Sequence, residues 1–402
     1  MTLEARVCTA AFFVYLGIGA TGPILPEVRR SLALSAADIG IVVAAFGLAR
    51  LCVDLPGGAL AARLGFRIPF LLGSLLLAAG STWSAVTAGV PGLVTGQILA
   101  GIGCVFCHVT ALVVLSSQAS AGTSGRTMGF YFGATFAGLA LGGAIAGQIA
   151  AVLGWRAAFL GAATASLAGF LVVLLPGRRP AASAPRPGPS PGSAQWRPLL
   201  APHLLSVYLL HFTALFLWAG VRTAVWPFIA SEVGGLSVRA IGLALGIGSF
   251  VTLGTLASAG ALSDRWGKVP VITVGLLASV AGLAVPLLAT SAGALLASLL
   301  LLDLGQGILA PSASALLADV HRSTPGIGTA TGLMRLLGDL GWLVGPLAVT
   351  GVIERLDYSA GLAVATLVPL GNLLLLRVHR LALQTGESPG CPVAAGAGPR
   401  GG

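Results

Sequence analysis

The sequence predicts an all-α polytopic membrane protein, with twelve transmembrane helices in two pseudo-symmetric six-helix bundles. Hydrophobic residues make up 56% of the 402 residues, whereas charged residues make up 8%, against about 25% in a soluble domain. The apolar segments recur at lengths near 20–27 residues, and about 20 residues cross a bilayer as a helix. These segments are continuous and do not alternate with period two, so helices are predicted rather than the strands of a barrel.

The predicted spans follow the apolar segments in order. They cover residues 7–28, 38–61, 69–88, 91–117, 126–150, 156–175, 203–230, 238–263, 269–290, 293–318, 326–352 and 357–378. Between the sixth and seventh spans, residues 178–193 are rich in Pro, Ala, Ser and Arg, which is typical of a solvated linker. We therefore expect an N-terminal bundle at 1–176, a flexible cytoplasmic linker at 177–200, a C-terminal bundle at 201–380 and a disordered cytoplasmic tail at 381–402.

The basic residues predict the orientation of the bundle. With an even number of spans, both termini lie on one side of the membrane. The loops and tails of that side hold 14 Lys and Arg residues, and the opposite loops hold five. The positive-inside rule therefore predicts a multi-pass protein of the cell membrane, with both termini in the cytoplasm.

The net charge of +10 does not indicate a nucleic-acid partner, because the basic residues are distributed over short loops. Cys104 and Cys107 form a C-x-x-C pair without a second pair of ligands, which is a weak signal for metal. We expect no cofactor and no metal. The expected partners are a small-molecule substrate, protons and the lipid bilayer, and the protein is expected to be a monomer.

An internal repeat relates the two halves. Residues 58–67 (GALAARLGFR) follow the second span, and residues 260–268 (GALSDRWGK) follow the eighth span at an offset of 202. Residues 34–40 match residues 236–242 at the same offset, and three glycines of the fifth span recur in the eleventh at an offset of 203. Three matches at nearly one offset indicate a duplicated six-span unit.

The loop after each second span of a half resembles a motif of the major facilitator superfamily, G-x-L-x-D-R-x-G-[RK]. Residues 260–268 fit it fully, whereas the first copy has Ala62 at the Asp position. The resemblance implies the major facilitator fold and a loop that helps to gate the inward side. The residues that match the motif are Gly58, Arg63, Gly65, Arg67, Gly260, Asp264, Arg265, Gly267 and Lys268.

Two further patterns resemble the twelve-span drug:proton antiporter branch of that family. One is L-G-x5-P-x-x-P in the first span, at Leu16, Gly17, Pro23 and Pro26. The other is a glycine pattern in the fifth span, at residues 129–147, in which two positions differ from the branch. In the fourth span Gln97 stands where the branch has an Arg that is tied to proton coupling. Generic helix packing is the alternative explanation of the glycines.

Six charged residues lie inside predicted spans, where each needs a partner or a function. Arg50 and Asp54 in the second span, and Arg335 and Asp339 in the eleventh, are two Arg-to-Asp pairs at i, i+4. Each pair lies on one helix face. The resemblance implies that these antiparallel spans are neighbours across the halves, so Arg50 would face Asp339. We predict a four-charge latch between the halves; the alternative is two local pairs that only neutralise each other.

Asp303 in the tenth span is the first candidate for proton coupling, because a carboxylate without water can take up and release one proton per cycle. Asp339 and Asp54 are further candidates. Arg222 in the seventh span can pair with Asp303 or bind an anionic substrate group. A static bridge between Asp303 and Arg222 is the alternative.

The substrate cavity is expected to include polar and aromatic side chains of the spans. The candidates are Arg222, Gln97, Gln306, Trp218, Trp226, His108, Phe132 and Phe136. A lone histidine within a membrane is more often a hydrogen-bonded packing residue, and aromatics near span ends are ordinary interface anchors.

The predicted function is a secondary active transporter that exports a small amphipathic compound by alternating access, coupled to proton influx. The alternative is uptake or facilitated exchange of a polar metabolite by the same fold, which the missing Arg of the fourth span favours. An enzyme is not expected, because no nucleophile–base pair and no metal cluster is evident.

Overall fold

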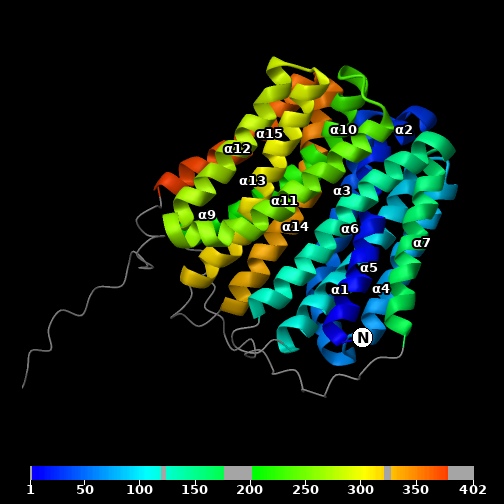
Figure 1. The fold of residues 1–402 in the computed structure, drawn as a ribbon. Helices are drawn as coiled ribbons and strands as arrows, with labels where there is room; N and C mark the ends of the chain where they lie inside the picture. The colour runs from blue at the N-terminus through cyan, green and yellow to red at the C-terminus, as the bar shows by residue number, and fades with distance from the viewer. Residues whose placement is uncertain (1, 119–123, 176–201, 321–326, 379–402) are drawn as a thin grey trace, which may run out of the picture.

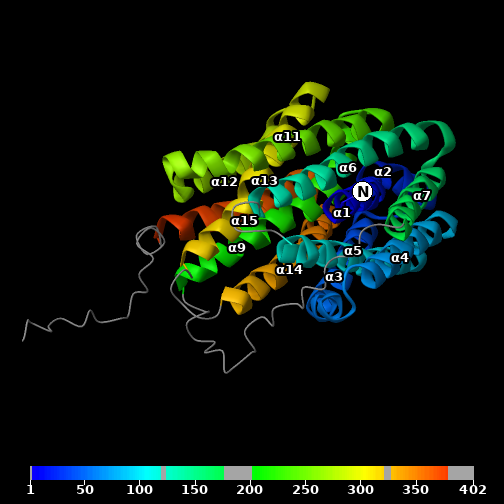
Figure 2. The ribbon, with the colours of Figure 1, turned by 60° about the horizontal axis from the view of Figure 1, so that its bottom comes forward.

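The computed structural model describes residues 2–118, 124–175, 202–320 and 327–378, which form one helical bundle (Figure 1). The expected linker at 177–200 and the expected tail at 381–402 lie outside the described residues. Figures 1 and 2 both show residues 2–175 on one side of the bundle and residues 202–378 on the other.

Twelve helices in the described ranges are long and apolar enough to cross a membrane, which confirms the prediction of twelve spans. The first half contains α1 (Leu3–Gly19), α2 (Thr21–Leu32), α3 (Ala36–Leu64), α4 (Arg67–Val86), α5 (Val90–Gln118), α6 (Ser124–Leu153) and α7 (Trp155–Leu174). The second half contains α9 (Pro202–Phe216), η1 (Leu217–Val225), α10 (Trp226–Phe228), η2 (Ile229–Val233), α11 (Val238–Trp266), α12 (Lys268–Leu288), α13 (Ala292–Val320), α14 (Ile327–Arg355) and α15 (Tyr358–Val378).

The halves repeat each other helix by helix. Helices α3 and α11 have 29 residues each, as do α5 and α13. Both α3 and α11 are followed by a glycine with positive φ, at 70° for Gly65 and 84° for Gly267. Side chains with a Cβ rarely adopt that conformation, so the second glycine of each loop motif has a backbone function.

Two spans depart from a continuous α-helix. The first span divides at Ala20 into α1 and α2, just before Pro23. Because proline has no N–H, it cannot donate to the Gly19 carbonyl one turn earlier, and the proline pattern of this span accounts for the break. In the seventh span, η1 and η2 are π-helical, a rare conformation that is frequent at functional sites.

Small residues bring the halves together along two helix pairs, α3 with α14 and α6 with α11. A Cβ on Gly242 of α11 would lie 2.6 Å from the Gly143 carbonyl oxygen and 2.9 Å from the Gly147 Cα, both on α6. On the other pair, a Cβ on Gly47 would lie 2.9 Å from the backbone nitrogen of Leu343. The backbones therefore approach as closely as they do in other small-residue membrane interfaces.

We expect Gly242→Leu to destabilise the protein by about 1–3 kcal/mol, the usual range for overpacking. The leucine side chain would have to separate α6 from α11 at their contact. The thermal unfolding midpoint of the purified protein measures the effect. Gly254→Leu is the matched control on the same helix, because nothing lies within 4 Å of a Cβ there; an equal loss in the control would contradict the interpretation.

Candidate functional site

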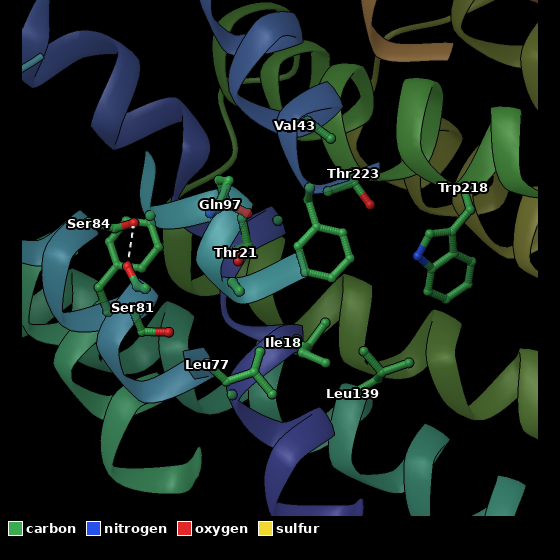
Figure 3. Close-up of a pocket in the computed structure, with 18 of the residues that line it drawn as sticks. Ile18, Thr21, Val43, Leu77, Ser81, Ser84, Gln97, Leu139, Trp218 and Thr223 are labelled. Carbon is green, nitrogen blue, oxygen red and sulfur yellow. Dashed lines mark hydrogen bonds between the residues drawn. The ribbon is translucent and has the colours of Figure 1, made fainter. Parts of the chain in front are cut away.

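A cavity lies between the two halves, and both contribute to it (Figure 3). Figure 3 shows Trp218 and Thr223 of η1 across the cavity from Ser81 and Ser84 of α4. The lining residues that matter below are Thr21, Phe46, Ser81, Gln97, Trp218, Arg222, Thr223, Leu245, Ser249 and Trp342. The cavity volume is about 70 Å³, whereas sites for drug-sized ligands measure about 300–1,000 Å³. The cavity must therefore widen before it accepts such a compound.

A buried ion pair adjoins this cavity. Arg222 Nε donates to Asp303 Oδ1 at 2.6 Å, and Thr252 Oγ1 donates to the same oxygen at 3.1 Å. The second guanidinium nitrogen, Nη2, donates to the Leu245 carbonyl at 2.9 Å and to Ser249 Oγ at 2.8 Å. Asp303 is fully buried, and only Arg222 reaches the cavity. The structure thus brings together the two residues that the sequence offered as partners.

The two carboxylate oxygens of Asp303 differ in their hydrogen bonding. Oδ2 is buried and has no hydrogen-bond partner among the described residues. It lies against Gly248 of α11, where a Cβ would collide with it. A buried acceptor without a partner costs free energy and needs an explanation, and this oxygen is therefore a candidate position for a bound proton.

Replacing Gly248 with Ala is expected to push the Asp303 carboxylate away from Arg222, because a methyl group would take the place of Oδ2. We expect a loss of about 1–3 kcal/mol in stability, together with a loss of the proton-driven transport that the sequence predicts. Transport into vesicles and the unfolding midpoint measure the two effects. Gly254→Ala, on the same helix in open space, should leave both unchanged. A Gly248→Ala variant with full transport would contradict this placement of the carboxylate.

Four charges form a second polar cluster between α3 and α14. Arg50 Nε donates to Asp339 Oδ1 at 2.8 Å. Arg335 donates to both oxygens of Asp54, with Nε at 2.8 Å from Oδ2 and Nη2 at 2.6 Å from Oδ1. Both ion pairs cross from one half to the other, as expected from the i, i+4 pattern together with the helix neighbours that the family resemblance implied. That these ion pairs act as a latch between the two halves remains a prediction.

The four-charge cluster is next to the cavity. The Arg50 guanidinium lies 5.2 Å from the centre of the Trp342 ring, and Trp342 packs against Phe46 with 5.4 Å between ring centres. Both aromatic residues line the cavity. A change in the ion pairs can therefore reach the cavity through these two rings.

Of the residues predicted to line the cavity, Arg222, Gln97 and Trp218 do so. The other five, Gln306, Trp226, His108, Phe132 and Phe136, do not line this cavity. Trp226 donates through Nε1 to the Leu295 carbonyl at 3.1 Å and belongs to the apolar core. His108 has the hydroxyls of Tyr15 and Tyr131 at 2.8 Å from Nδ1, which fits a hydrogen-bonded packing residue.

The residues of the loop motif lie at the ends of α3 and α11 and at the starts of α4 and α12. Arg67 donates to the Leu174 carbonyl at 3.4 Å, and Lys268 Nζ donates to the Ala315 carbonyl at 2.8 Å. Asp264 and Arg265 are exposed. The gating function of this loop remains a proposal.

A third set of contacts, which no sequence pattern indicated, joins the halves at the end of the bundle where Figure 1 labels α2 and α10. Arg29 Nη1 donates to Glu232 at 2.7 Å and to the Tyr358 hydroxyl at 3.2 Å. Tyr358 in turn donates to Glu232 at 2.6 Å. Glu354 accepts from the first backbone N–H of α3, that of Ala36, at 2.8 Å. The loop charges predicted the orientation of the bundle but not these contacts, because no spacing rule relates residues so far apart in sequence.

Within the described part of the chain, no group of three or more His, Cys, Asp or Glu residues could hold a metal ion.

Comparison with known proteins agrees with this architecture. The Major Facilitator Superfamily matches residues 7–220 and again residues 207–391. Quinolone resistance protein NorA of Staphylococcus aureus is 33% identical over 104 residues, which are 25% of this chain and 27% of NorA. Multidrug resistance protein 1 of Bacillus subtilis (strain 168) is 26% identical over 166 residues, which are 41% of this chain and 43% of that protein. Each match thus spans less than half of the relative.

A solved structure has the same fold over nearly the whole chain. It is that of a bacterial homolog to the human lysosomal transporter Spinster, in an inward-facing and occupied conformation. The TM-score is 0.74 at 14% identity, and the match covers 96% of this chain and 98% of the other.

Proposed function

We propose that this chain, which belongs to the Major Facilitator Superfamily, is a secondary active transporter that exports a small amphipathic compound in exchange for protons. The family and the fold are those of transporters rather than enzymes. The observation that supports the proposal best is the buried Arg222–Asp303 pair, which meets a cavity lined by both halves. Relatives whose names include quinolone resistance and multidrug resistance support export of an amphipathic compound.

Alternating access would come from rocking the halves about the cavity. The Arg29–Glu232–Tyr358 contacts would close one end in the present arrangement and separate when that end opens. The four-charge cluster would hold α3 to α14 in one state and release it in the other. Loop residues such as Asp264 and Arg265 would gate the end that carries the N-terminus.

The orientation in the cell membrane follows from the basic residues. The side with both termini has 14 of the Lys and Arg residues and the opposite loops have five. By the positive-inside rule the termini lie in the cytoplasm. In that orientation the Arg29 contacts face the exterior, and the loop motifs face the cytoplasm.

A second candidate function is uptake or facilitated exchange of a polar metabolite. Gln97 favours it, because this amide lines the cavity at a position where the drug:proton antiporter branch has an Arg tied to proton coupling. A neutral amide can bind a polar compound through hydrogen bonds without any proton transfer.

Proteoliposomes with an imposed pH gradient test the proposal against this alternative. An acidic lumen should drive accumulation of an amphipathic compound from a panel, because protons leave the lumen as the compound enters. Protein-free liposomes and the Asp303→Asn variant are the controls. Accumulation only with acid outside would indicate cotransport instead, and no accumulation with either gradient would contradict proton-coupled transport.

A further inference from the structure

We infer that Arg222 is a tethered cation that makes proton and substrate exclude each other, so that the exported compound is uncharged rather than anionic. The inference rests on the proposed exchange at Asp303 and adds to it the class of the substrate. It follows from the place of one guanidinium group, between a buried carboxylate and the cavity.

The guanidinium of Arg222 lies between the Asp303 carboxylate and the cavity. Its Nε and Nη2 are engaged with Asp303, Leu245 and Ser249, whereas Nη1 donates to none of the described residues. The side chain lines the cavity, and its guanidinium carbon lies 4.1 Å from the centre of the Trp218 ring. An aromatic face attracts a cation at this distance, so Trp218 holds the guanidinium on its cavity side while Asp303 holds it on the other side.

Among the described residues, Asp303 is the one charged group that pairs with Arg222. From α11, Asp303 meets the neutral Thr252 and Gly248, and α12 has no charged residue after Lys268 at its first position. Helix α9 has no acidic residue, Lys or Arg. The charged residues inside α14, Arg335 and Asp339, are paired with residues of α3. Among the described residues, Arg222 is the charged group in contact with Asp303. Protonation of Asp303 therefore leaves Arg222 without any charged partner.

A guanidinium stays charged under these conditions, and a buried charge without a partner is costly. When Asp303 binds a proton, we expect Arg222 to leave Asp303 and to move further into the cavity, with Trp218 as its remaining neighbour on that side. When Asp303 is ionised, Arg222 withdraws and the pair is neutral as a whole. A cavity of about 70 Å³ offers little room for both the guanidinium and a ligand, so the two compete for it.

This competition determines which substrates can be exchanged for protons. An uncharged compound binds while Arg222 is withdrawn and is displaced after Asp303 takes up a proton, which is antiport. An anion would bind more tightly once Arg222 is released, so proton and anion would travel together. The neutral polar and aromatic lining, with Thr21, Gln97, Trp342 and Phe46, suits an uncharged amphipathic compound.

The charge of the cavity can be measured without knowing the substrate. A Ser81→Cys reporter faces the cavity across from Trp218 (Figure 3). Its reaction rates are measured with two methanethiosulfonate reagents, one carrying a sulfonate and one a trimethylammonium group, after subtraction of the rates of the unmodified protein. Adding Asp303→Asn, which resembles the protonated state, should raise the sulfonate-to-ammonium rate ratio by about tenfold. This is the effect expected for one newly exposed positive charge near the reporter.

Adding Arg222→Gln to the Asp303→Asn reporter should return the ratio to its starting value. The inference is overturned if Asp303→Asn leaves the ratio unchanged, if the rise persists without Arg222, or if neither reagent reaches the cavity. The vesicle assay separates the two claims. Exchange of protons for an anion would overturn the substrate class alone, whereas absence of any proton-driven transport would overturn the proposed function.

Discussion

Transport driven by a pH gradient is expected to fall to the level of protein-free liposomes when Asp303 is replaced by Asn. The amide preserves the shape of the side chain but cannot take up and release a proton. Arg222 then faces a neutral group, and removing one partner of a buried ion pair costs about 3–5 kcal/mol. Uptake into vesicles with an acidic lumen measures the first effect, and thermal unfolding measures the second.

The double variant Asp303→Asn, Arg222→Gln separates coupling from stability. Removing both charges of a buried pair is often close to neutral, so the unfolding midpoint should return most of the way to that of the unmodified protein. Proton-driven transport should stay absent, because neither side chain can exchange a proton. A single Asp303→Asn variant that still transports at full rate under the gradient would exclude Asp303 as the proton carrier and leave the pair a static bridge.

The fold could be predicted from the sequence because a bilayer imposes a length on every span. Continuous apolar segments of sufficient length leave few alternatives to helices, and all twelve appear in the described chain. The repeat at an offset of 202 also indicated which helices correspond, and α3 and α11 indeed have the same length. What the sequence does not encode in any simple pattern is the π-helical geometry of η1, which carries Arg222 and Trp218.

The site was predictable only in part, and the reason differs between residues. A charge within a span requires a partner, so Arg222 with Asp303 and the charges of α3 and α14 could be named in advance. An aromatic residue has no such requirement. Trp218 and Trp226 are eight residues apart in one span, yet one lines the cavity and the other packs in the core. The direction of a neutral side chain depends on helix rotation and packing, which the sequence alone does not determine here.

The contacts at the Arg29 end illustrate a further limit. Arg29, Glu232 and Tyr358 come from the ends of three different spans. Their contact depends on how the two halves are placed relative to each other in this conformation. No local pattern of residues in the sequence indicates that placement. The four-charge cluster could be predicted because its spacing repeats within each helix and because the resemblance to the major facilitator superfamily implied that the two helices are neighbours.

In the four-charge cluster, Asp54→Arg is expected to abolish transport and to destabilise the protein by about 3–5 kcal/mol. The substitution places a third positive charge beside Arg50 and Arg335, and Asp339 is then the only acid left in the cluster. Adding Arg335→Asp restores an opposite pair across the halves at that position. We expect the double variant to regain at least half of the lost stability and a measurable part of the transport.

The double variant also decides between the two interpretations of these charges. Exchanging Asp54 with Arg335 keeps both ion pairs between α3 and α14, but it places two positive charges on one helix and two negative charges on the other. If the charges mainly neutralise each other within each helix, the double variant should be worse than either single variant. Recovery therefore supports pairing across the halves, and unfolding midpoints with vesicle transport for the three variants measure it. A latch also has to open, so recovery of stability without any recovery of transport would show that the pairs hold the halves together without taking part in the cycle.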